Sequence, residues 1–103
     1  MKSLDTLELE TIRWAEARRI IPNAKAATQL LKAISEIGEL ADAEIKGDIP
    51  GIVDGVGDLL IVLAIYCDLR GLTLRQCWNA AYDEIKNRKG TLLETGVFLK
   101  DAA

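Results

Sequence analysis

Hydrophobic residues recur at helical spacing along most of this chain. Between residues 24 and 46, apolar side chains follow one another every three or four positions, as one face of an amphipathic helix requires. Similar stretches, separated by proline and glycine, occur before and after this segment. The predicted helices span residues 4–19, 24–46, 50–69 and 74–87. The expected fold class is therefore all-α, a single four-helix-bundle-type domain over residues 1–103, with residues 90–103 as an extended loop.

Turn-forming residues support the limits of these helices. Pro22 ends the first helix, because a proline disfavours helical geometry at the preceding residue. Asn23 is expected to cap the second helix, and Thr73 the fourth. Pro50 suits the first turn of the third helix, where a missing N–H does no harm. Gly71 should end that helix.

The second half of the third helix, residues 59–67 (LLIVLAIYC), is apolar on every side. Such a helix must be surrounded by other apolar surface, and a short chain has little to offer. We therefore expect a homo-oligomer. The β-branched residues leave a buried strand as an alternative, although no nearby segment is suited to pair with it. The run is too short to cross a bilayer, so no membrane partner is expected.

Composition narrows the classes of function. The chain has 103 residues, a net charge of −3, two cysteines and no histidine. Mild acidity and the lack of a large basic face argue against nucleic acid as a partner. The first ten residues lack the apolar core of a signal peptide, so a cytoplasmic protein with free thiols is expected. Without histidine, any catalysis must depend on carboxylates, a metal ion and basic side chains.

Four acids stand out in the middle of the chain. Glu36 and Glu39 are three positions apart, and Asp54 and Asp58 are four apart on the next predicted helix, so each pair shares a helix face. If the intervening turn makes these helices antiparallel, the four carboxylates converge, and their repulsion calls for a cation. Oxygen ligands favour magnesium, with manganese or calcium as alternatives. Gly38, between the glutamates, suggests close approach of another backbone or a ligand.

Each of these acids also has a simpler explanation. The glutamates could be solvated helix acids, and Asp58 could be satisfied by the helix dipole. For Asp54, the sequence supports a metal ligand and a first-turn helix acid about equally. Other acids in the region are expected to be solvated: Asp42, Glu44 and Asp48.

Cationic side chains lie on both sides of the acids. Lys32 precedes Glu36 by one helical turn and shares its face. Three more cations cluster beside a glycine near the end of the fourth helix: Lys86, Arg88 and Lys89. This cluster is suited to bind phosphate, or it complements the negative end of the helix dipole.

The order of these segments resembles the MazG-like all-α nucleoside triphosphate pyrophosphohydrolases. The segments that carry the likeness are WA at 14–15, QLLK at 29–32, EIGEL at 36–40, GD at 57–58, AYDEIKNRKG at 81–90 and GVFLK at 96–100. The resemblance implies magnesium-dependent hydrolysis of a (deoxy)nucleoside triphosphate to the monophosphate and pyrophosphate. It also implies a dimer or tetramer, and places Trp14 near the nucleotide.

Under this resemblance, the acids would hold magnesium at the triphosphate and activate a water molecule. Glu36 or Glu39 would take the proton from that water, since a carboxylate not fully engaged with metal can act as a base. The family usually has an acid at position 55, where this chain has Gly55, so Asp54 could replace it. Asp83 stands where the family often has asparagine. These departures favour the alternative function, a non-catalytic helical oligomer or adaptor.

Overall fold

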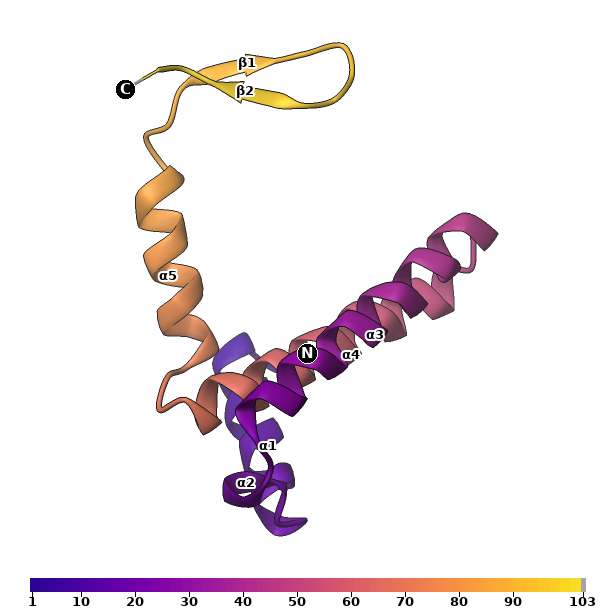
Figure 1. Cartoon of the computed structure of the whole chain (residues 1–103), viewed down its shortest axis with the longest axis vertical. Coiled ribbons are helices and arrows are strands. Elements are labelled where there is room, and N and C mark those ends of the chain that lie inside the picture. The colour runs from indigo at the N-terminus through magenta and orange to yellow at the C-terminus, as the bar shows by residue number, and fades with distance from the viewer. Residues whose placement is uncertain (103) are drawn as a thin grey trace.

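The computed structural model describes residues 1–102 and is mostly helical, which confirms the all-α class (Figure 1). Its elements are α1 (Leu4–Ala17), α2 (Ile20–Asn23), α3 (Ala26–Lys46), α4 (Ile49–Leu69), α5 (Leu74–Ile85), β1 (Gly90–Leu92) and β2 (Phe98–Lys100). Helix limits agree with the sequence-based prediction to within two residues, except for the short helix α2 between the first two predicted helices.

Helices α3 and α4 form a long antiparallel hairpin, which is the condition on which the four predicted acids would converge (Figure 1). Gly47 ends α3 in the left-handed conformation, with a φ of 65°. The Asp48 carboxylate then caps α4 by accepting a hydrogen bond from the backbone N–H of Gly51, at 3.1 Å. Asp48 is exposed, as expected, but it also has this structural role.

The two helices of the hairpin approach each other closely at Gly55. A Cβ atom at this position would lie 3.2 Å from the Cβ and 3.3 Å from the Cα of Leu40 on α3. Gly38, by contrast, has no atom within 4 Å of where its Cβ would be. The close backbone approach expected at Gly38 is therefore found at Gly55, because Gly55 lies on the face of α4 that packs on α3.

Helices α1 and α2 pack against the end of the hairpin where α4 finishes (Figure 1). A small buried cluster joins them there, formed by Ala15, Ile21 and Ile65. The prediction that Asn23 caps the next helix is wrong. Its side-chain amide instead donates to the carbonyl of Arg19, at 2.9 Å, and the residue preceding α3 is Lys25, which makes no side-chain cap. The amide is thus already engaged with the turn before α2.

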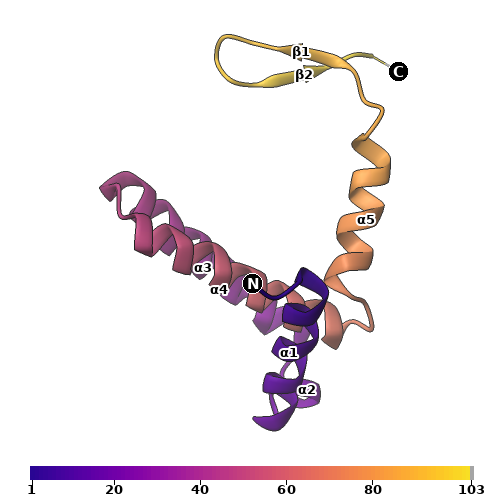
Figure 2. The ribbon, with the colours of Figure 1, turned by 180° about the vertical axis from the view of Figure 1, so that it is seen from behind.

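Helix α5 leaves the end of α4 and projects away from the hairpin (Figures 1 and 2). Gly71, with a φ of 74°, follows the last turn of α4, as predicted. Thr73 caps α5 in a reciprocal arrangement with Gln76, which confirms the predicted cap. None of the residues of α5 is buried. The four long helices therefore do not pack around a common core within one chain.

The prediction of an extended loop after α5 is wrong, because residues 90–100 form a β-hairpin. Strands β1 and β2 pair antiparallel, with Gly90 opposite Lys100 and Leu92 opposite Phe98. Gly96 adopts a φ of 87° in the connecting turn, a conformation that glycine reaches without strain. The Leu and Phe residues suit strands, but the three-residue strands are too short for a periodicity to be recognised.

Much apolar surface is left exposed by this arrangement. The chain of 11.3 kDa exposes 8030 Å², whereas a compact monomer of this mass is expected to expose about 5,700 Å². Its radius of gyration is 16.4 Å, compared with about 13 Å for a compact domain of this length. On α3 the exposed apolar side chains follow the helical period: Leu30, Leu31, Ile34, Ile37 and Ile45.

Candidate functional site

The α3–α4 hairpin brings three of the predicted acids near one another. Glu36 and Glu39 lie on α3, and Asp58 lies on the antiparallel α4. Burial raises the pKa of Glu36 above its ordinary value, and the charges of Glu39 and Asp58 raise it further. The nearby positive charge of Lys32 lowers the pKa of Glu36. Charges from both helices therefore meet at Glu36.

One oxygen of this group lacks a partner. Glu36 Oε2 is buried and makes no hydrogen bond to any described residue, and Gln29 Oε1 on the same helix is in the same condition. Buried carboxylate oxygens are normally paired, and leaving one unsatisfied costs free energy. A cation bound at Glu36 would satisfy this oxygen.

Asp54 and Asp58 border a small acidic hollow together with Glu39. The hollow has a volume of about 270 Å³ and lies over the part of the hairpin nearest its turn, where Asp42 and Lys46 also line it. Glu36 does not line the hollow. The four predicted ligands are thus divided between the hollow and a position one helical turn away.

The acids are near one another but do not form a ready-made coordination sphere. Within residues 1–102, no three acidic, cysteine or histidine side chains lie close enough to hold a metal ion as they stand. Like charges this near repel one another unless a cation neutralises them. The donor set itself, carboxylate oxygen only, fits a hard divalent ion. The residues present therefore suit magnesium, provided that their side chains rotate inward.

The predicted phosphate-binding cations are distributed unevenly. Lys32 is close enough to influence Glu36. Lys86 forms an ion pair with Asp83, at 3.2 Å, near the end of α5. Arg88 and Lys89 follow in the connection to β1, which both views place away from the α3–α4 hairpin (Figures 1 and 2). The structure does not bring these three residues to the acids of their own chain.

Trp14 is also separate from the acidic hollow. It lies half-exposed on α1, with the Arg18 guanidinium 4.5 Å from the centre of its ring. This contact is a cation–π interaction within one helix. Trp14 borders neither of the two cavities described for this chain.

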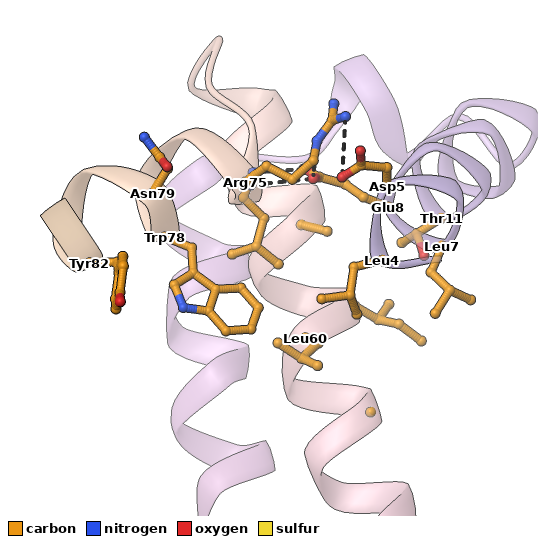
Figure 3. A pocket seen from close by; sticks show the side chains of 14 residues that line it. Leu4, Asp5, Leu7, Glu8, Thr11, Leu60, Arg75, Trp78, Asn79 and Tyr82 are labelled. Carbon is orange, nitrogen blue, oxygen red and sulfur yellow. Dashed lines mark hydrogen bonds and ion pairs between the residues drawn. The ribbon is translucent and has the colours of Figure 1, made fainter. Parts of the chain in front are cut away.

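Sequence reasoning missed one buried acid, Glu8 on α1. Its carboxylate accepts hydrogen bonds from the backbone N–H of Leu74, at 2.6 Å, and of Arg75, at 3.3 Å, and from Arg75 Nε, at 3.0 Å (Figure 3). Glu8 therefore caps α5 from a different helix. No local pattern predicts this role, because the hydrogen-bond partners of Glu8 lie 66 and 67 positions further along the chain.

Beside Glu8 lies an open apolar cavity of about 590 Å³ between α1, α4 and α5 (Figure 3). Leu4, Leu60, Trp78 and Tyr82 line it, and Arg75 and Asp5 border it near Glu8. Gly57 lines this cavity, whereas its neighbour Asp58 lines the acidic hollow. Successive residues of α4 thus reach two different cavities.

Comparisons with protein-family models, curated proteins and solved structures find no significant match to this chain. Among the described residues, no helix is both long and apolar enough to cross a membrane.

Proposed function

We propose that this protein is a MazG-like nucleoside triphosphate pyrophosphohydrolase, which hydrolyses a (deoxy)nucleoside triphosphate to the monophosphate and pyrophosphate with magnesium. The observation that carries this proposal is the meeting of Glu36, Glu39 and Asp58 across the α3–α4 hairpin, with one buried Glu36 oxygen unpartnered. A fold that only needed stability would not keep Glu39 and Asp58 where their charges raise the pKa of Glu36.

The residues divide into two roles. Glu39 and Asp58, with Asp54 beside them, provide the oxygen ligands that border the hollow. Bound magnesium would supply charge neutralisation at the triphosphate and acidify a water molecule. Glu36 or Glu39 would accept the proton from that water, since both lie on the face of α3 near Asp58. Lys32 would add positive charge for a phosphate oxygen.

We further propose that the working form is a homo-oligomer, a dimer or a tetramer. The surface that the chain exposes beyond a compact monomer is about 2,300 Å², and obligate homodimers commonly bury such areas on each subunit. The exposed apolar row on α3 supports the same conclusion, since a second copy of this face would cover it. If Lys86, Arg88 and Lys89 bind phosphate at these acids, they must do so from a partner, because α5 carries them away from the hairpin of their own chain.

The alternative is a non-catalytic helical oligomer or adaptor with the same fold. One observation favours it, namely that no three ligand-type side chains in residues 1–102 are arranged to hold a metal ion. Gly55 is a second point in its favour, because Leu40 packs tightly against this position, where the family usually has an acid. Turnover separates the two candidates, since only the enzyme releases pyrophosphate.

The decisive experiment is to incubate the protein with a panel of ribo- and deoxyribonucleoside triphosphates and magnesium, and to measure pyrophosphate. Glu39→Gln and Asp58→Asn should abolish its release while leaving the circular dichroism spectrum unchanged. Glu44→Gln is the matched control, because Glu44 is an exposed acid on the same helix outside the hollow. Full activity in both site variants would refute the assignment, and no turnover with any triphosphate would favour the adaptor.

The role of Asp54 needs a separate titration. If Asp54 is a ligand, the Asp54→Asn variant should need a substantially higher magnesium concentration for half-maximal activity. As a first-turn acid, it contributes only about 0.3–1 kcal/mol through the helix dipole, and the two titration curves should superimpose. Restoring an acid through Gly55→Glu is a poor test, because Leu40 packs against that position.

Oligomeric state is measured by light scattering at micromolar concentration. A monomer would contradict the proposed assembly without bearing on the acids. A dimer or tetramer that Leu31→Asp dissociates would support the α3 face as the contact, because Leu31 is exposed there and a buried charge is costly.

A further inference from the structure

The two cysteines of the chain meet where α4 ends and α5 begins. Cys67 lies in the last turn of α4 and is buried, whereas Cys77 lies on α5 and is exposed. Their Sγ atoms are 4.0 Å apart, in hydrogen-bond contact. Burial raises the pKa of the Cys67 thiol to about 11, and the neighbouring Cys77 contributes to this rise.

We propose that Cys67 and Cys77 form a dithiol modification site, which a small-molecule disulfide oxidises to an intramolecular disulfide that ties α5 to α4. This inference does not depend on the proposed hydrolase activity. The separation between the two sulfur atoms, 4.0 Å, must shorten to a bond of about 2.05 Å. Only the turn from Arg70 to Thr73 separates the two helices, and the sulfur atoms already lie 4.0 Å apart across it.

Helix α5 can supply the necessary movement. None of its residues is buried, and its first turn is held mainly by the Glu8 carboxylate and by its own cap at Thr73. A small shift of this helix, together with rotation about the Cα–Cβ bonds of the cysteines, would bring the sulfur atoms together. A helix packed on a large core would resist such a shift.

The difference in exposure sets the order of the two steps. The exposed Cys77, as thiolate, attacks one sulfur of the disulfide RSSR, which forms the mixed disulfide Cys77–S–SR and releases RS⁻. Cys67 then loses its proton to solvent and attacks the Cys77 sulfur, which forms the Cys67–Cys77 bond and releases a second RS⁻. In total, two protein thiols are oxidised and one RSSR is reduced to two RSH. The high pKa of Cys67 makes this second step the slower one.

The consequence is a covalent tie at the junction of α4 and α5. The bond would fix the direction in which α5 carries Lys86, Arg88 and the β-hairpin, because all of them follow α5 in the chain. A disulfide restricts the unfolded chain as well, so the oxidised protein should be the more stable form.

The test uses the full chain with oxidised glutathione, followed by intact mass spectrometry and thermal unfolding. The wild type should lose two hydrogen atoms, retain no glutathione and unfold at a temperature several degrees higher than in reducing buffer. Cys67→Ser should stop at a stable glutathione adduct on Cys77, and its unfolding temperature should not depend on the redox buffer. Cys77→Ser should remain unmodified, because its remaining thiol is buried.

Three results would overturn the proposal. The wild type could accumulate the same adduct as Cys67→Ser, which would show that the second thiol cannot reach the first. It could form disulfide-linked pairs of chains through Cys77, visible on a non-reducing gel. It could also resist oxidation altogether, with both thiols still titratable after unfolding.

Discussion

Replacement of Glu8 by alanine should release α5 from the rest of the chain. The Glu8 side chain is only 8% exposed, and its carboxylate accepts three hydrogen bonds from Leu74 and Arg75 at the start of α5. Glu8→Ala leaves the two backbone N–H groups of this helix start without a partner. No buried side chain of α5 compensates for that loss.

The size of the effect follows from the groups involved. Loss of a capping side chain costs about 0.5–2 kcal/mol, and hydrogen bonds to a charged group contribute about 1.5–3 kcal/mol. We therefore expect Glu8→Ala to lower the free energy that holds α5 in place by about 2–4 kcal/mol. The exposed ion pair of Arg75 with Asp5, at 3.6 Å, adds little. Glu8→Gln, which keeps one carbonyl oxygen but no charge, should fall between the wild type and Glu8→Ala.

Amide hydrogen exchange is the appropriate measurement, because it separates local opening from global unfolding. In Glu8→Ala, the amides of residues 74–85 should exchange about 30-fold faster or more, which corresponds to about 2 kcal/mol. The amides of α3 and α4 should change little. Glu10→Ala is the matched control, because Glu10 lies on α1 and only pairs with exposed Lys2. If α5 exchanges at the wild-type rate in Glu8→Ala, the cross-helix cap does not hold α5.

Three further predictions concern the α3–α4 hairpin. The raised pKa of Glu36 means that the folded state binds this proton more tightly than the unfolded state, so the free energy of unfolding falls as pH rises above the ordinary glutamate pKa. With a chelator present, Glu36→Gln should therefore have a higher melting temperature than the wild type at neutral pH. The difference should disappear in acid. Gly38→Ala should stabilise the fold by about 0.5–1 kcal/mol. Gly55→Ala should stabilise it less or destabilise it, because the new methyl group meets α3. Thermal unfolding of the two variants measures the difference. Asp48→Ala should cost about 0.5–2 kcal/mol in urea unfolding, and the same cost in Asp42→Ala would contradict the capping role.

The local signals in the sequence were sufficient where a short segment determines its own structure. The helical spacing of apolar residues in α3 and the caps at Thr73 and Gly71 depend on neighbours within a few positions, so the sequence predicted them. The glycine- and proline-containing turn indicated only that two helices are joined there, and the structure shows that they are antiparallel. The same local reasoning failed for β1 and β2, because three-residue strands show no periodicity.

The candidate site was predictable in part for the same reason. Glu36 and Glu39 share a helix face by spacing alone, and the antiparallel hairpin adds Asp58. The spacing did not predict that Asp54 and Asp58 border a hollow that Glu36 does not line. That separation depends on where side chains meet across two helices, which no single helix specifies.

Tertiary contacts decided what lies far apart in the sequence. The sequence by itself determined which segments are helical and which faces are apolar, because backbone hydrogen bonds and side-chain periodicity act over a few residues. Only the tertiary structure showed that Glu8 caps a helix more than sixty positions away, that Gly55 rather than Gly38 lies at the close approach, and that α5 leaves the hairpin. These features depend on how helices pack, and packing joins residues that share no local pattern.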